Sequence, residues 1–76
     1  MKMDLETLAK IVEERVPTAR ATCVPEVNQI VVTFTNRPDV EVSLLTPYLQ
    51  SQLRMGRIGT DDLSELLFTL RRITNS

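Results

Sequence analysis

The fold is decided by residues 18–45, which read TARATCVPEVNQIVVTFTNRPDVEVSLL. Apolar and polar side chains alternate along this stretch and β-branched residues are frequent, which is the pattern of half-buried strands. Turn-forming residues interrupt it at 25–28 and 36–39, so we predict a three-stranded antiparallel meander. One face of this sheet is expected to meet the core, and it carries Ala19, Ala21, Cys23, Ile30, Val32, Phe34, Val40, Val42 and Leu44.

The opposite face of the predicted sheet is mostly polar and rich in threonine. We expect it to be solvated, as one face of an antiparallel sheet commonly is. The third strand is short, and it forms either a regular strand or an irregular edge. The residues of the solvated face are Arg20, Thr22, Val31, Thr33, Thr35, Glu41 and Ser43.

Helical periodicity flanks the strands on both sides. We predict helices over residues 4–16, 46–56 and 60–73. Small polar residues suit their N-caps, proline suits a first turn, and proline or glycine suits the ends. The boundary residues are the N-caps Asp4, Thr46 and Thr60, the first-turn Pro47, and the helix stops Pro17 and Gly56.

Together these elements predict one α+β domain over residues 1–76, in the order α-β-β-β-α-α. The three-stranded antiparallel meander would pack under the helices as a small two-layer domain. A chain of 76 residues lies near the lower limit for folding on a hydrophobic core alone. Its single cysteine cannot form an intrachain disulfide, and without histidine it lacks the ligands of a structural zinc site. By elimination, self-association is the remaining extra source of stability.

The composition also argues against catalysis. Without histidine the commonest general base is missing. Cys23 falls on the core-facing side of a strand, where we expect a buried thiol that acts as a small hydrophobe. The carboxylate pairs Glu13–Glu14 and Asp61–Asp62 fit a helix surface and a helix start better than an acid–base pair. We therefore predict no enzyme, no catalytic residues, no metal site and no cofactor.

The location of the protein is predicted from its start and its hydropathy. No apolar run approaches the ~20 residues that span a bilayer, so no membrane association is expected. Met1-Lys2-Met3-Asp4 leads into a charged amphipathic helix without the apolar segment of a signal peptide. A lone free cysteine suits a reducing compartment. We expect a cytoplasmic protein.

Four arginines lie in the last third of the chain: Arg54, Arg57, Arg71 and Arg72. They make nucleic acid an alternative partner, although a net charge of −1 provides no general attraction for phosphates. If the second and third helices pack antiparallel, Arg71 and Arg72 lie far from the other two. That geometry argues against one continuous basic patch without excluding a local one.

Two aromatic residues indicate a protein interface instead. Phe68 lies off the apolar stripe of the third helix, and Tyr48 lies in the first turn of the second, where we expect partial exposure. Aromatic residues and arginines are frequent among the residues that dominate binding energy. The predicted interface consists of Tyr48, Phe68, Arg57, Arg71 and Arg72.

Two resemblances accompany these patterns. The α-β-β-β-α order resembles the double-stranded-RNA-binding domain in topology and size. Where that family has a lysine-rich start to its final helix, this chain has Asp61 and Asp62, so the resemblance implies shared architecture and not RNA binding. The stretch from Leu49 to Ile73 loosely resembles helix–turn–helix dimerisation segments of small bacterial regulators, over about a third of the chain.

The leading functional prediction is a small non-enzymatic protein–protein interaction module. It would regulate, inhibit or adapt another protein through its second and third helices, as small inhibitors encoded by phages and mobile elements do. Two alternatives stay open: a nucleic-acid-binding regulator that uses the four arginines, and a homo-oligomeric structural protein such as a homodimer. The sequence does not identify the partner.

Overall fold

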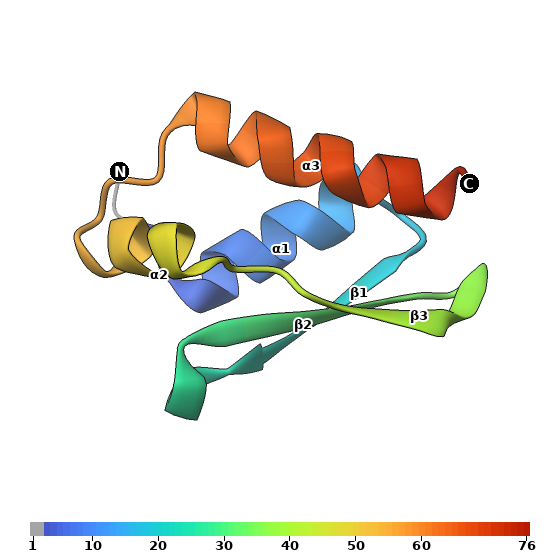
Figure 1. Cartoon of the computed structure of the whole chain (residues 1–76), viewed down its shortest axis with the longest axis horizontal. Coiled ribbons are helices and arrows are strands. Elements are labelled where there is room, and N and C mark those ends of the chain that lie inside the picture. The colour runs from blue at the N-terminus through green and yellow to red at the C-terminus, as the bar shows by residue number, and fades with distance from the viewer. Residues whose placement is uncertain (1–2) are drawn as a thin grey trace.

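The computed structural model describes residues 3–76. Residues 1 and 2 lie outside the described part. They belong to the N-terminal stretch that we used to predict the absence of a signal peptide. The element order confirms the predicted α-β-β-β-α-α arrangement (Figure 1). The elements are α1 (Leu5–Arg15), β1 (Ala19–Val24), a short 3₁₀ turn η1 (Pro25–Val27), β2 (Gln29–Phe34), β3 (Arg37–Ser43), α2 (Pro47–Arg54) and α3 (Thr60–Thr74).

The three strands form an antiparallel sheet in the order β1-β2-β3, so β1 and β3 are its edges. Ala21 pairs with Val32, and Val32 pairs with Val42, which places these three side chains in one row across the sheet. The third strand forms, with a register shift between Thr33 and Phe34. Pro38 lies in the irregular part of β3, and its missing N–H group suits an edge strand.

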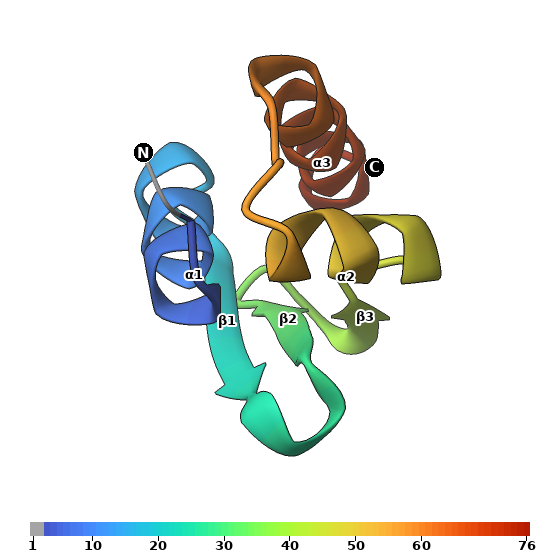
Figure 2. The same ribbon diagram turned by 90° about the vertical axis from the view of Figure 1, so that its left-hand side faces the viewer.

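All three helices lie on one side of the sheet. Figure 2 shows α1 and α2 beside each other over the sheet, with α3 above them. The antiparallel packing of α2 and α3 that we considered as one possibility is not formed, because α2 crosses the direction of α3 (Figures 1 and 2). With only eight residues, or about two turns, α2 is too short to pair with α3 along a common stripe.

The core lies between the sheet and the helices. Of the side chains predicted to face it, those on the central strand β2 and at the strand ends are buried, among them Ile30, Val32 and Phe34. Ala21, Cys23, Val40 and Val42 pack against the core but are only half-buried, because β1 and β3 are edge strands. The helices contribute the buried residues Leu8, Ala9, Val12, Leu49, Leu53, Leu66, Leu67 and Leu70.

Helix boundaries follow the predicted capping residues with one exception. The Asp4 carboxylate accepts a hydrogen bond from the Thr7 N–H at 2.8 Å, and the Thr46 hydroxyl accepts one from Leu49 N–H at 3.2 Å. The N-cap of α3 is Gly59, and Thr60 is its first helical residue. Gly59 takes this position because it is extended and its N–H donates to the Asp62 carboxylate at 3.3 Å.

The end of α3 is hydrogen-bonded to the turn between β2 and β3 and to the connection between α1 and β1. The Asn36 side-chain amide donates to the Thr74 carbonyl at 2.8 Å, and the Thr74 hydroxyl donates to Asn36 Oδ1 at 2.9 Å. The Thr18 hydroxyl also hydrogen-bonds the Thr74 hydroxyl. These contacts fix the position of α3 over the sheet, and thereby the shape of the surface between α3 and β3.

Candidate protein interface

Large apolar side chains are exposed at four places on the described surface. Val27 lies in η1, Tyr48 in α2, Met55 after α2 and Phe68 in α3. An isolated exposed apolar residue is common and needs no function. A functional role for any of these four side chains must therefore be argued from the residues around it.

Phe68 is 62% exposed, which confirms that it lies off the apolar stripe of α3. Leu66, Leu67 and Leu70 on the same helix are buried. The guanidinium carbon of Arg72 lies 5.9 Å from the centre of the Phe68 ring, within the range of a cation–π contact. The structure therefore brings together two of the residues predicted for the interface.

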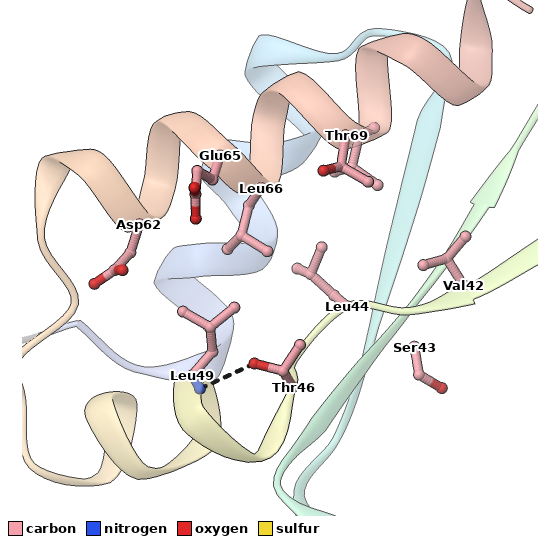
Figure 3. Close-up of a pocket in the computed structure, with 10 residues that line it drawn as sticks. Val42, Ser43, Leu44, Thr46, Leu49, Asp62, Glu65, Leu66 and Thr69 are labelled. Carbon is pink, nitrogen blue, oxygen red and sulfur yellow. Dashed lines mark hydrogen bonds between the residues drawn. The ribbon is translucent and has the colours of Figure 1, made fainter.

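A groove runs between α3 and the segment that joins β3 to α2 (Figure 3). Its volume is about 290 Å³, and its lining is mostly apolar, with the carboxylates of Asp62 and Glu65 on the α3 side. In Figure 3 the side chains of Leu44 and Leu66 point toward one another across the hollow, whereas Ser43 points away from it. The groove is lined by Val42, Ser43, Leu44, Thr46, Leu49, Asp62, Glu65, Leu66, Thr69 and Leu70.

The groove adjoins the surface around Phe68. Glu65 and Thr69 line the groove and also line a shallow depression beside Phe68 and Ser64. We call the groove and this depression together the α3–β3 surface. Its β3 side was not predicted from the sequence. The alternation placed Val42 and Leu44 toward the core, but only the placement of α3 shows that space remains above Val42.

Tyr48 is 59% exposed, as predicted, but it lies outside the residues that line the α3–β3 surface. Its hydroxyl accepts a hydrogen bond from the Gln52 side-chain amide at 2.9 Å, one turn along α2. Tyr48 is therefore held on its own helix and is not joined to Phe68 by any contact that the structure describes between residues 3 and 76.

The four predicted arginines form two groups. Arg54 lines a cavity with Asp4 and Glu6 at the start of α1, and Arg57 lies in the connection that follows α2. Arg71 and Arg72 lie at the other end of α3, next to the C-terminus (Figure 1). A single basic patch made of all four is therefore not formed.

The second arginine group includes a residue that the sequence prediction did not. Arg37, at the start of β3, donates to the Ser76 carbonyl at 3.3 Å and lies 3.5 Å from the Asp39 carboxylate. Ser76 also borders Arg72. The side chain of Arg71 donates to the Arg15 carbonyl at 3.5 Å. A residue at the start of a strand can contact a helix end in this way only through the tertiary fold, so nothing in the local sequence of Arg37 indicated the contact.

Cys23 is half-buried rather than buried as predicted, because β1 is an edge strand. Partial burial, and then the negative charges of Glu6, Asp4 and Glu13, raise the pKa of the Cys23 thiol. A raised pKa keeps the thiol protonated, and a protonated thiol is a weak nucleophile. The environment of Cys23 therefore does not activate it.

The paired carboxylates have structural roles. Glu13 accepts a hydrogen bond from the Ala21 N–H at 3.0 Å, and Asp62 accepts one from Gly59. Within residues 3–76 no group of three or more histidine, cysteine or acidic residues is arranged to hold a metal ion. No helix of that part of the chain has the length and apolar character to cross a membrane.

No protein-family model matches the chain, and neither a similar curated protein nor a similar solved structure was found. The argument for function therefore depends on the α3–β3 surface itself.

Proposed function

We propose that this protein is a small non-enzymatic interaction module that regulates, inhibits or adapts a partner protein. One observation carries the proposal: an apolar groove of about 290 Å³ lies next to an exposed aromatic residue, Phe68, with Glu65 and Thr69 between them. This volume is at the lower end of ordinary small-molecule pockets, roughly 300–1,000 Å³. The groove therefore suits a few side chains of a partner better than a whole ligand. The free cysteine supports a cytoplasmic setting.

Phe68 has the features of a residue that dominates binding. It is aromatic, it is accompanied by Arg72, and polar side chains such as Ser64, Glu65 and Thr69 surround it. Anchors of this kind are typically surrounded by polar contacts that exclude water when the partner binds. Removal of such an anchor typically costs 2 kcal/mol or more, which corresponds to about a 30-fold loss of affinity.

The test compares Phe68→Ser with Val27→Ser in pull-downs of the tagged full chain from the source cell extract, with and without nuclease. Val27 is a matched control, because it is also 62% exposed and lies in η1, on the sheet side of the molecule (Figure 1). We expect a stoichiometric, nuclease-resistant protein partner that Phe68→Ser loses and Val27→Ser retains. Equal capture of the partner by the two variants would refute the proposal that the α3–β3 surface binds it.

The same experiment separates the alternatives. Loss of all captured material on nuclease treatment would favour the nucleic-acid hypothesis and the arginines at the end of α3. Light scattering at several protein concentrations tests the homo-oligomer. A mass that rises with concentration in the native chain but not in Phe68→Ser would show that the surface binds a second copy.

A further inference from the structure

The two free edges of the sheet differ in how they are covered. In β1 the N–H group of Ala21 points away from β2, and the Glu13 carboxylate of α1 accepts its hydrogen bond at 3.0 Å. Helix α1 therefore covers this edge with a side chain that satisfies the backbone. Native proteins commonly blunt an edge strand in such ways, because an open edge can pair with another chain.

The edge of β3 is open. Leu44 N–H donates to the Ile30 carbonyl at 2.9 Å, so Leu44 faces β2. Backbone groups alternate between the two sides of an antiparallel strand, so those of Val42 also face β2 and those of Glu41 and Ser43 point outward. Both residues are exposed, and within residues 3–76 no side chain covers their N–H groups as Glu13 covers Ala21.

The groove lies directly along this open edge. Val42 and Leu44 form its lower wall, and Glu65 and Leu66 of α3 lie above them (Figure 3). A strand added to β3 would lie about 4.8 Å from it, and its alternate side chains would point into the space under α3. The groove therefore provides room for the inward side chains of a fourth strand, and its wall of Val42, Leu44 and Leu66 favours aliphatic ones.

Negative charges predominate beside the open edge, where Arg37 at the start of β3 supplies one positive charge and pairs with Asp39 at 3.5 Å. Asp39 and Glu41 are exposed on β3, and Asp62 and Glu65 lie on α3 at the rim of the groove. Residues 38–46 contain no lysine or arginine. If a second copy paired antiparallel with this edge so that Glu41 lay opposite Glu41, two carboxylates would face each other, which is unfavourable. Charge complementarity therefore favours a basic segment over a second copy of this chain.

We propose that β3 binds an extended segment of a partner protein as a fourth strand, with lysine or arginine alternating with aliphatic residues. The aliphatic side chains enter the groove beside Val42 and Leu44. The basic side chains lie on the other face, opposite Glu41, and backbone hydrogen bonds join the segment to Glu41 and Ser43. This inference rests on the proposed interaction function and adds the chemistry of the partner.

The first test uses a synthetic peptide of about eight residues, an ordinary strand length, in which lysine alternates with valine. A peptide in which glutamate replaces lysine is the control. The peptides are titrated into the isotope-labelled full chain and followed by amide chemical shifts and hydrogen exchange. We expect slowed exchange at the Glu41 and Ser43 amides with the lysine peptide alone, and weaker binding at higher salt. Shifts confined to other elements, or equal binding of both peptides, would overturn the proposal.

Two variants test the contacts separately. Ser43→Pro removes an N–H group that points away from β2, so the ladder between β2 and β3 is preserved and proline is tolerated at such a position. It is expected to lower peptide affinity at least tenfold, with unchanged amide shifts in α1 as the sign of an intact fold. Glu41→Lys is expected to reverse the preference toward the glutamate peptide. Unchanged peptide affinity in both folded variants would refute the proposal.

The outcomes separate this inference from the proposed function. A partner whose capture depends on Phe68 but survives Ser43→Pro would refute strand addition and leave the interaction module standing. Slowed exchange of Glu41 and Ser43 at high protein concentration without peptide, together with a dimeric mass, would show that a second copy occupies the edge and would also overturn the proposal. Loss of the captured partner in both Phe68→Ser and Ser43→Pro is the result expected here.

Discussion

Leu70 and Phe68 lie two residues apart on α3 and face opposite environments, so their truncation tests which side of the helix is free. Leu70 is fully buried, and Phe68 is 62% exposed. Truncation of a buried leucine to alanine costs about 2–5 kcal/mol, and less where the surroundings can fill the space. Because Leu70 also lines the groove, solvent can reach part of the vacated space. We therefore expect about 2–3 kcal/mol for Leu70→Ala.

For a domain of this size, such a loss lowers the thermal midpoint by roughly 10–20 °C. Phe68→Ala removes only an exposed ring and its contact with Arg72, so we expect a change within about 0.5–1 kcal/mol. Both variants are compared with the native chain by thermal and urea unfolding monitored by circular dichroism, at two protein concentrations. A loss from Phe68→Ala as large as that from Leu70→Ala would show that Phe68 is covered in solution. The α3–β3 surface would then not be available to a partner.

Three further predictions concern the backbone and the thiol. Gly56→Ala should destabilise the protein by about 1 kcal/mol in urea unfolding, because Gly56 has a φ of 69°, which alanine rarely adopts. The Cβ of the alanine would meet no atom within 4 Å, so this cost comes from the backbone conformation alone. Glu13→Gln should leave the fold intact, whereas Glu13→Ala should speed hydrogen exchange of the Ala21 amide severalfold, because it removes the acceptor of the Ala21 hydrogen bond. Equal exchange rates of the Ala21 amide in both variants would contradict the proposal that Glu13 protects the edge of β1. Burial raises the pKa of Cys23, so its contribution to stability is complete below the ordinary pKa of a thiol and is lost as the pH rises through the raised folded-state pKa. Cys23→Ala should therefore flatten the decline in stability at alkaline pH in a series of unfolding curves, and an unchanged decline would assign it to other groups.

The features predicted correctly from the sequence are those determined by interactions between residues close together in the chain. Asp4, Thr46 and Pro47 mark helix starts through bonds made within one turn, and the alternation of Ile30, Val32 and Phe34 follows from the strand period. The single error in capping has the same origin. Gly59 and Thr60 are both acceptable N-caps, and the bond from Gly59 to Asp62 decides between them.

The parts that the sequence did not predict depend on how elements are placed in space. The groove exists because α3 lies above the β3 edge without filling the space over Val42, and the sequence of neither element shows this. Arg37 joins the end of α3, and Glu13 covers β1, through contacts between residues far apart in the chain or on different elements. Phe68 was found because helical periodicity alone places it away from the buried stripe.

The open edge of β3 could pair with another copy of the same chain as well as with a partner. Exposed strand edges are where identical chains stack into amyloid fibrils, and natural proteins guard them with proline and like charges. On β3, Pro38 and the exposed Glu41 match these two devices, whereas the charge of Asp39 is paired with Arg37. On the proposed strand addition, the carboxylate of Glu41 would thus both attract a basic segment and oppose pairing with a second copy, so a neutral substitution at Glu41 is expected to increase self-association at high protein concentration.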